Sequence, residues 1–519
     1  MTVTPTSSRI AGIASAALQS SELTAEPTAP VTRGLTLDRL WLLVPPIGLF
    51  AWLQHVLIDP ADFWWHLRTG QIIVQTGLIP TTDLFTFTRA GMPWTNQAWL
   101  MQVLLYLAYR LGDLRLIVFV HALTVALGYL LVELGCLQAP GTRSRDAALA
   151  TLFAIGLGSL NWGVRPQSIS FLFFGLLVYL VERHRSGRLW TAWLWPPVMA
   201  LWANLHGAFI FGLLFLLIYA GACTISDLRD SHRLRQPTVW LLTAVFLSVL
   251  ALSLNPQGPV GIARYIVGFG QSKSTLALNQ EFAALSIRER DGAVFFVVTL
   301  FFMLVVSWRK VRLPGYLIAA MLVFGVMSLY ARRVLPWFGM AFAPAWAIAF
   351  SSFPAARRVP AKERRRRPLN YLLSGLLLAA AVASVPWIRD VLPFFGGPHS
   401  YVDARRTPVA AVRTLCHDEK RPRVFSDIAY GSYVAWACPG APTFMDTRFE
   451  LYPAVMWTDY LLVASAQFGW EDVLDRYAVN SLLLDKEQQA SLVGAARAST
   501  SWVLVYEDHI AILFQRQGL

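Results

Sequence analysis

The chain has 519 residues, of which 55% are hydrophobic and only 14% are charged, and its formal net charge is +13. Soluble domains carry about 25% charged residues, so lipid must solvate much of a chain this apolar. The basic residues stand in short clusters between apolar runs, as in the cytoplasmic loops of membrane proteins, which argues against a nucleic-acid partner.

Apolar segments follow one another between residues 39 and 387. A transmembrane helix needs about 20 mostly apolar residues, so the chain is predicted to be a polytopic α-helical membrane protein with about 11 spans. The segment 97–112 is a further apolar stretch, which we expect to lie at the interface or dip into it. Additional spans of this kind would raise the count to about 12 or 13. The predicted spans are 39–58, 115–135, 147–163, 168–182, 190–205, 207–224, 238–254, 292–307, 314–330, 334–351 and 369–387.

Clusters of Lys and Arg indicate the orientation, because cytoplasmic loops are enriched in these residues. The N-terminus is therefore predicted to be cytoplasmic, with 1–32 forming a disordered tail and 33–387 the transmembrane domain. The first external loop, 59–96, and residues 388–519 then lie outside, and we expect a bacterial inner or plasma membrane. The basic clusters are Arg33 and Arg39, Arg143 and Arg145, Arg183 to Arg188, Arg229 to Arg235, Arg309 to Arg312, and Arg357 to Arg367.

Residues 388–519 alternate short apolar runs with helix-like segments, which predicts a small extracytoplasmic α/β domain. Cys416 and Cys438 both fall in this domain. In an oxidising compartment they either form a disulfide or remain two separate buried thiols. The expected strands are Arg423–Asp427, Thr443–Asp446, Ser481–Asp485, Trp502–Tyr506 and Ile510–Gln515, and the expected helices are 406–416, 453–465, 470–478 and 486–497.

The first external loop combines charged and aromatic residues in the stretch DPADFWWHLRTGQ. Helical spacing places Asp62, His66 and Thr69 on one face, with Trp65 and Arg68 adjacent. A helix of this composition lies in the plane of the membrane interface. It is either a mere anchor or part of an active site.

The spacing of Asp62, His66 and Arg68 resembles that in the catalytic subunit of oligosaccharyltransferase, a GT-C superfamily membrane glycosyltransferase. That family has a cytoplasmic N-terminus, one span, and then a long external loop that opens with an acidic motif. Asp83 in DLFTFT matches the place of the family's second acidic position. Protein O-mannosyltransferases and aminoarabinose transferases share the layout, but their Asp-Glu pair is missing in this sequence.

The resemblance implies a GT-C-like fold and an inverting glycosyltransferase. Such an enzyme moves a sugar from a polyprenyl-phosphate donor to a glycan, lipid or protein acceptor. Asp62 is the predicted base that takes the acceptor proton, with Asp59 as the reserve candidate. The neighbouring His66, Arg68, Asp83 and Trp94 are predicted to contact substrate, and Asp62, Asp83 and Glu281 are candidate ligands for a divalent cation, Mg or Mn. No other cofactor is expected.

Arginine side chains on the external side are candidates for the donor phosphate. Arg332 and Arg333 run against the positive-inside trend, so they either bind a phosphate in a bidentate way or extend to the membrane surface. Arg165, between two predicted spans, is a second candidate of the same kind. Asn204 and His206 stand beside Gly207 at a predicted helix end, where they either line a substrate cavity or hydrogen-bond to the backbone.

Two predicted strands of the soluble domain end in Asp427 and Asp446. Ligands bind at strand C-termini in open α/β sheets, so Asp446 and the nearby Arg448 are predicted to shape an acceptor groove. The alternative is a set of salt-bridged surface loops. Tyr430-Gly431 matches only part of the Trp-Trp-Asp-Tyr-Gly acceptor motif of oligosaccharyltransferase, so recognition of a peptide sequon is not implied.

Two other functions fit the composition. A transporter or flippase for a lipid-linked saccharide would place ionisable groups near the bilayer midplane and show two related halves. A non-catalytic membrane scaffold would lack a cavity between Asp62 and the Arg332–Arg333 pair.

Overall fold

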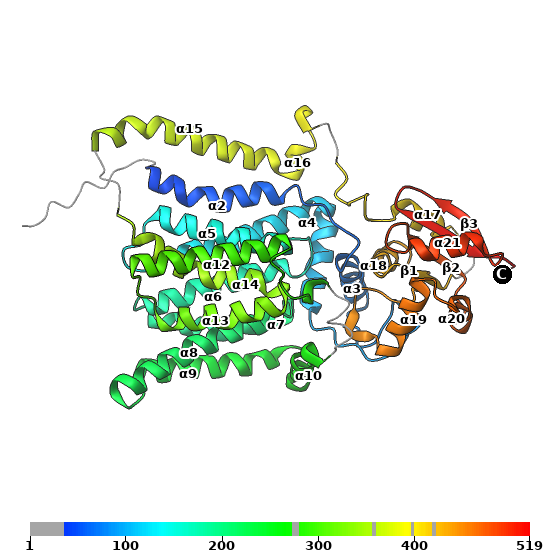
Figure 1. Cartoon of the computed structure of the whole chain (residues 1–519), viewed down its shortest axis with the longest axis horizontal. Coiled ribbons are helices and arrows are strands. Elements are labelled where there is room, and N and C mark those ends of the chain that lie inside the picture. The colour runs from blue at the N-terminus through cyan, green and yellow to red at the C-terminus, as the bar shows by residue number, and fades with distance from the viewer. Residues whose placement is uncertain (1–35, 272–279, 355–359, 396–398, 418–421, 519) are drawn as a thin grey trace, which may run out of the picture.

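The computed structural model describes residues 36–271, 280–354, 360–395, 399–417 and 422–518. A bundle of helices that run side by side forms one end of the molecule, and a small sheet domain forms the other (Figure 1). The predicted tail 1–32 and part of the basic run Arg357 to Arg367 lie outside the described residues.

Every predicted span overlaps a helix. The helices of the bundle and of the connections at its end are α2 Leu37–Leu53, α3 Phe63–Thr76, α4 Trp99–Cys136, α5 Ser144–Gly158, α6 Ser168–Arg185, α7 Trp195–Leu205, α8 Phe209–Ser231, α9 Gln236–Ala251, α10 Gly258–Gln271, α12 Arg290–Arg309, α13 Gly315–Tyr330, α14 Leu335–Ser351, α15 Pro360–Ser384 and α16 Pro386–Arg389.

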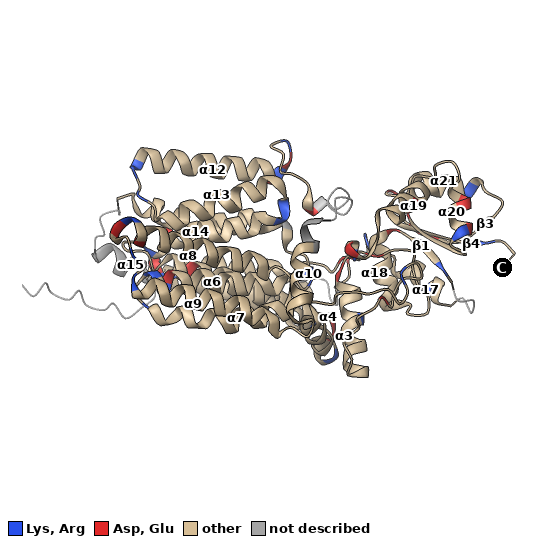
Figure 2. Ribbon diagram, turned by 90° about the horizontal axis from the view of Figure 1, so that it is seen from below, with Lys and Arg blue, Asp and Glu red and all other residues tan. Residues whose placement is uncertain are grey.

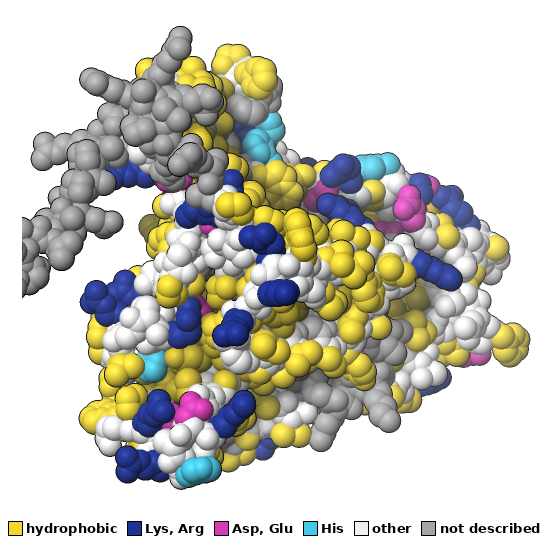
Figure 3. Space-filling model, turned by 60° about the vertical axis from the view of Figure 1, so that its left-hand side comes forward, with side chains coloured by type: hydrophobic (Ala, Val, Ile, Leu, Met, Phe, Trp, Pro, Cys, Tyr) yellow, Lys and Arg dark blue, Asp and Glu magenta, His cyan; other side chains and the backbone are white. Residues whose placement is uncertain are grey.

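Five helical segments in the described part of the chain are long and apolar enough to cross a membrane. The chain is therefore an integral membrane protein. Charged residues are sparse along the middle of the bundle and gather toward its ends (Figure 2), and several Lys and Arg side chains lie on the end away from the sheet domain (Figure 3). The total number of spans and the sidedness remain predictions. The five segments are Trp99–Cys136, Phe209–Ser231, Gln236–Leu254, Arg290–Arg309 and Arg332–Ser351.

The segment 97–112 supplies the first part of α4. The helix bends where Gly112 and Asp113 leave helical geometry, and Asp113 has a φ of 53°. The part beyond the bend matches the predicted span 115–135. The first part packs against α3 so closely that a Cβ on Gly70 would collide with the carbonyl of Gln102. This contact fixes the position of α3 at the end of the bundle.

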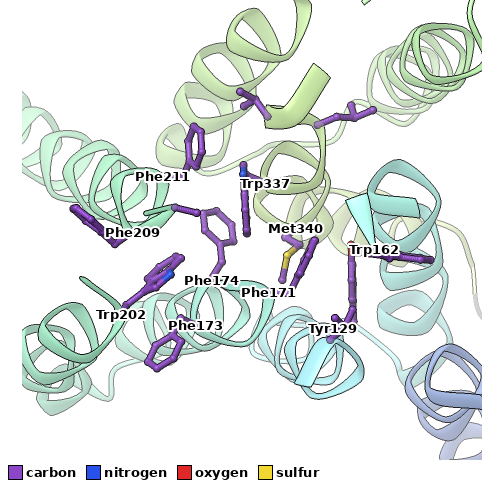
Figure 4. Packing of buried hydrophobic residues seen from close by; sticks show 14 of the residues in the cluster. Tyr129, Trp162, Phe171, Phe173, Phe174, Trp202, Phe209, Phe211, Trp337 and Met340 are labelled. Atoms are coloured by element: carbon purple, nitrogen blue, oxygen red, sulfur yellow. The ribbon is translucent and has the colours of Figure 1, made fainter. Parts of the chain in front are cut away.

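Aromatic side chains fill the interior of the bundle (Figure 4). Phe171 of α6 stacks on Trp337 of α14 with ring centroids 5.3 Å apart, and Phe211 of α8 stacks on the same indole at 5.7 Å. Gly128 of α4 lies against the backbone of Phe171, where any side chain would collide. Small residues let membrane helices approach this closely, and the dispersion contacts of the rings then hold them together.

The sheet domain, residues 399–518, has the predicted α/β character. Its strands are β1 Val424–Ser426, β2 Ser481–Asp485, β3 Trp502–Glu507 and β4 Ala511–Arg516, in the order β1-β2-β4-β3. β1 and β2 are parallel, with Phe425 opposite Leu482, and the other pairs are antiparallel. Its helices are α17 Val409–Cys416, α18 Ile428–Ala437, α19 Ala454–Ala464, α20 Trp470–Arg476 and α21 Ala490–Ala498.

Three local features differ from the sequence predictions or decide between them. Thr443–Asp446 is not a strand, because Thr443 makes only single bridges to Val424 and Thr86. Asp427, the predicted end of a strand, is the N-cap of helix α18, and its carboxylate accepts the Ala429 N–H at 2.9 Å. Cys416 and Cys438 form a disulfide, with their Cα atoms 5.5 Å apart.

Candidate active site

Asp62 lies directly before α3, between the bundle and the sheet domain. It occupies the N-cap position, but its side chain makes no capping hydrogen bond, so the carboxylate is not committed to the helix. Ser432 of α18 holds this turn by donating to the Ala61 carbonyl at 2.5 Å and accepting the Trp65 N–H at 3.4 Å. The sheet domain therefore positions the first turn of α3.

A cavity of about 440 Å³ opens where the bundle meets the sheet domain. It brings together five sequence-predicted site residues from five separate connections: Asp62, Arg165, His206, Glu281 and Arg333. His66, Trp94 and Arg448, also predicted from the sequence, line it too. The remaining lining residues include Trp65, Thr95, Asn96, Gln97, Gln167, Arg264, Tyr265, Phe282, Thr447, Phe449 and Glu450.

Opposite charges meet inside this cavity. Arg165 forms an ion pair with Glu281 and donates to the Asn161 side chain at 3.2 Å. The guanidinium of Arg333 lies 4.5 Å from the ring centroid of Phe282, the residue after Glu281. Burial alone would raise the pKa of Glu281, but the charges of Arg165 and Arg333 outweigh burial and hold this pKa below its ordinary value.

The Asp62 carboxyl has a different environment from that of Glu281. Burial raises the pKa of Asp62, while the charge of Arg165 and a hydrogen bond from the Thr447 hydroxyl counteract part of this effect. The ionised form is therefore a stronger base than an ordinary exposed Asp. A carboxylate of this kind, at the wall of a cavity, is suited to accept a proton from a substrate hydroxyl.

Two neutral imidazoles lie nearby. Burial, with smaller contributions from Arg333 and Arg165, lowers the pKa of His206 to about 3. The Nδ1 atom of His206 accepts the Ala208 N–H at 3.2 Å and lies 2.9 Å from the Ser170 hydroxyl, which leaves the proton on Nε2. Burial also lowers the pKa of His66 well below its usual range, and its ring stacks on Trp65. Thus His206 both bonds to the backbone and lines the cavity.

Arg448 closes one wall and is 1% exposed. Its guanidinium pairs with Asp83 at 2.5 Å and with Asp446 at 2.6 Å. It also lies 4.8 Å from the ring centroid of Trp94. The carboxylates of Asp83 and Asp446 pair with this guanidinium and are not among the residues that line the cavity, and their contact with substrate stays a prediction.

Four other predicted residues lie outside the cavity lining. Each already has a structural partner. Arg332 pairs with Glu289, and Arg68 donates to Gln71 at 2.6 Å. Asn204 accepts the indole N–H of Trp99 at 2.7 Å, and Asp59 lies 3.8 Å from Arg406.

The predicted cation ligands do not assemble. Asp62 and Glu281 share the cavity, but Asp83 is buried behind Arg448. Among the described residues, no group of three His, Cys, Asp or Glu side chains is arranged to hold a metal ion. The positive charge in the cavity comes instead from arginine side chains.

The sequence analysis missed the contribution of residues Thr447 to Glu450 to the cavity wall, apart from Arg448. Tyr265 and Arg264 of α10 were missed as well. No local motif marks these residues, because their neighbours in the cavity are distant along the chain.

Comparison with known proteins identifies the architecture. The structure superposes on mycobacterial arabinofuranosyltransferase AftD with a TM-score of 0.55 over 93% of this chain, at 14% identity. The chain has a GT-C-like fold. It spans 40% of the length of AftD, so the likeness is one of fold. The predicted GT-C-like fold is thus confirmed.

Two further solved structures match less closely. Oligosaccharyltransferase of Archaeoglobus fulgidus, tethered with an acceptor peptide, gives a TM-score of 0.49 at 11% identity, covering 91% of this chain and 74% of its own. ArnT of Cupriavidus metallidurans, bound to undecaprenyl phosphate, gives 0.49 at 15% identity, covering 92% and 97%. No family model and no curated protein sequence matches the chain.

Proposed function

We propose that this chain is an inverting glycosyltransferase that moves a sugar from a polyprenyl-phosphate-linked donor to an extracytoplasmic glycan, lipid or protein acceptor. The observation that carries the proposal is the shared cavity, which Asp62, Arg165 and Arg333 all line. The GT-C-like fold supports a membrane glycosyltransferase at the level of architecture.

In the proposed reaction, Asp62 takes the proton of the acceptor hydroxyl or amide as that group attacks the anomeric carbon. The bond between this carbon and the phosphate oxygen breaks, and the polyprenyl phosphate leaves with the electron pair. Arg333 and Arg165 stabilise the leaving anion. Inversion needs only one base, because a single displacement forms no glycosyl-enzyme intermediate.

Arg165 forms an ion pair with Glu281. An incoming phosphate would therefore compete with a carboxylate for this guanidinium. Arg333 interacts with the aromatic ring of Phe282, and both arginines line the cavity. This arrangement favours an anionic phosphodiester over a neutral sugar alone, and it suits the second negative charge that the phosphate gains as it leaves.

The cavity also disfavours the scaffold alternative, which expects no such space between Asp62 and the Arg332–Arg333 pair. The experiment that tests the proposal is mass spectrometry of surface glycans and glycoproteins from cells with and without the gene. We expect one glycan species to lose a sugar in the deletion and to recover it when the gene is restored. Identical glycan profiles in the two strains would overturn the proposal.

A further inference from the structure

We propose that Gln167 and His206 form the subsite that holds the sugar of the donor, and that this sugar is neutral and is bound through its hydroxyl groups. Gln167 comes directly before α6, and His206 directly follows α7. The inference rests on the proposed function and names the class of sugar that the same cavity takes.

Gln167 carries a buried amide that makes no contact of its own with the rest of the protein. The residue occupies the N-cap position of α6, but its side chain makes no capping hydrogen bond. It is 5% exposed, and it lines the cavity. Within the described part of the chain, no group forms a hydrogen bond with this amide. A buried amide needs a hydrogen-bonding partner, so this one is suited to bind a polar group of a ligand in the cavity.

A chain of hydrogen bonds fixes which nitrogen of His206 carries the proton. The indole N–H of Trp202 donates to the Ser170 hydroxyl at 2.8 Å, and an indole nitrogen can only donate. The Ser170 proton is therefore left for His206 Nδ1, which lies 2.9 Å away. The backbone N–H of Ala208 donates to the same atom at 3.2 Å. Because Nδ1 accepts both bonds, the neutral ring keeps its proton on Nε2.

Ser170 brings Gln167 and His206 together. Its backbone N–H donates to the Gln167 carbonyl at 2.9 Å, and its hydroxyl contacts the His206 ring. Both residues line the same cavity, and no group in the described ranges forms a hydrogen bond with His206 Nε2. Gln167 therefore offers two N–H donors and a carbonyl acceptor to a ligand, and His206 offers one N–H donor.

This set of groups matches neighbouring sugar hydroxyls. Each hydroxyl can donate one hydrogen bond and accept others, which an amide beside an N–H donor satisfies. Neither Gln167 nor His206 carries a charge, so the pair gives no compensation to an ammonium or carboxylate group on the sugar. We therefore expect the bound sugar to be neutral.

The position of the subsite fits the connectivity of the proposed donor. Arg165, which is proposed to bind the phosphate, lies two positions before Gln167 in the connection that leads into α6, and it lines the same cavity. In the donor, the anomeric carbon of the sugar is bonded to a phosphate oxygen, so the sugar lies beside the phosphate. A guanidinium and an amide two residues apart can contact these two neighbouring groups at once.

Native mass spectrometry of the purified full-length chain tests the subsite. The probes are undecaprenyl phosphate alone, the same lipid carrying neutral glucose, mannose, galactose or arabinose, and the same lipid carrying cationic aminoarabinose. Gln167→Leu and His206→Phe remove the polar groups and keep side chains of similar size. Gln488→Leu, at an exposed glutamine of the sheet domain, is the matched control.

We expect at least one neutral sugar to raise the affinity of the native chain roughly tenfold over that for undecaprenyl phosphate alone, as one or two hydrogen bonds provide. Gln167→Leu and His206→Phe should each lose most of this gain and bind the lipid without sugar as the native chain does, while Gln488→Leu keeps the gain. Thermal unfolding in the same detergent shows whether each variant is folded, and Gln167→Leu alone decides the matter if His206→Phe is not.

Three results would overturn the inference. The first is a gain that survives in Gln167→Leu. The second is an equal loss of affinity for undecaprenyl phosphate alone, because the amide would then bind the phosphate. The third is a native chain that gains nothing from any neutral sugar or prefers the aminoarabinose lipid.

The enzyme and the subsite fail separately. Surface glycans of complemented cells supply the second readout, in which Gln167→Leu is expected to transfer roughly tenfold less sugar than the native chain. A gain in affinity that Gln167→Leu loses, in a chain that transfers no sugar, would refute the enzyme and keep the subsite. Undiminished transfer by Gln167→Leu would refute the subsite and keep the enzyme.

Discussion

Arg448 of the sheet domain donates to Asp83 of the loop between α3 and α4 at 2.5 Å, and neither side chain is exposed to solvent. The two residues are 365 positions apart in the chain. Asp446 binds the same guanidinium, and Phe85 and Trp94 cover it with ring centroids at 4.8 Å. The buried guanidinium of Arg448 therefore connects this loop to the sheet domain. Trp94 of the loop and Arg448 of the domain both line the candidate active site.

The first prediction concerns this buried cluster. Asp83→Asn removes one carboxylate of the pair and leaves the arginine buried with incomplete compensation, which costs about 3–5 kcal/mol of unfolding free energy. Thermal unfolding of the purified protein in detergent measures the loss. Arg497→Gln, which breaks a partly exposed pair with Glu507, is the control and should change stability by less than about 1 kcal/mol. Equal losses of stability in the two variants would show that the Asp83–Arg448 pair does not hold the loop against the sheet domain.

The second prediction separates two adjacent arginines. Arg333 lines the cavity, whereas Arg332 pairs with Glu289 outside the lining. Arg333→Gln should weaken binding of undecaprenyl phosphate roughly 10-fold to 100-fold, because it removes charge-assisted hydrogen bonds to the phosphate. Arg332→Gln should change the affinity by no more than about threefold. Native mass spectrometry of the purified protein with this lipid checks both, and a larger loss in Arg332→Gln would reverse the assignment.

The third prediction is a pH dependence. Burial raises the pKa of Asp62, and a base is active only when it is ionised. Transfer should therefore fall as the pH drops through this raised pKa, at a higher pH than an ordinary Asp would allow. His66 and His206 have lowered pKa values and stay neutral, so neither of these two cavity histidines should change the rate near neutral pH. A rate profile of transfer against pH checks this, and a flat profile down to pH 4 would contradict it.

The sequence predicted well what depends on local pattern. Each hydrophobic run gave a helix close to its expected bounds, because burial in lipid or in a helix interior is set by the side chains of that segment. β2 was predicted residue for residue as Ser481–Asp485, since its apolar run is buried on both faces. The segment Thr443–Asp446 has a similar pattern, but it makes only single bridges, so it does not become a strand.

The candidate site shows the same contrast between features that follow from local sequence and features that depend on distant residues. Asp62, Arg165, Arg333 and Glu281 were found because charged residues are costly at a membrane surface and stand out there. The pairing of Asp83 with Arg448 was not predicted, since the two residues are 365 positions apart and no spacing rule connects them. Thr447 was missed for the same reason, because its hydroxyl accepts the indole N–H of Trp65, which lies 382 positions away in the chain.

The most direct test of the central claim compares two neighbouring carboxylates. Asp62 lines the cavity, whereas Asp59 lies outside the lining near Arg406. Cells that lack the gene are complemented with the native chain, Asp62→Asn or Asp59→Asn, and their surface glycans are measured by mass spectrometry. Loss of a general base should reduce transfer roughly 100-fold to 10,000-fold in Asp62→Asn, at unchanged protein level, while Asp59→Asn restores the native profile. Full transfer by Asp62→Asn would contradict the account.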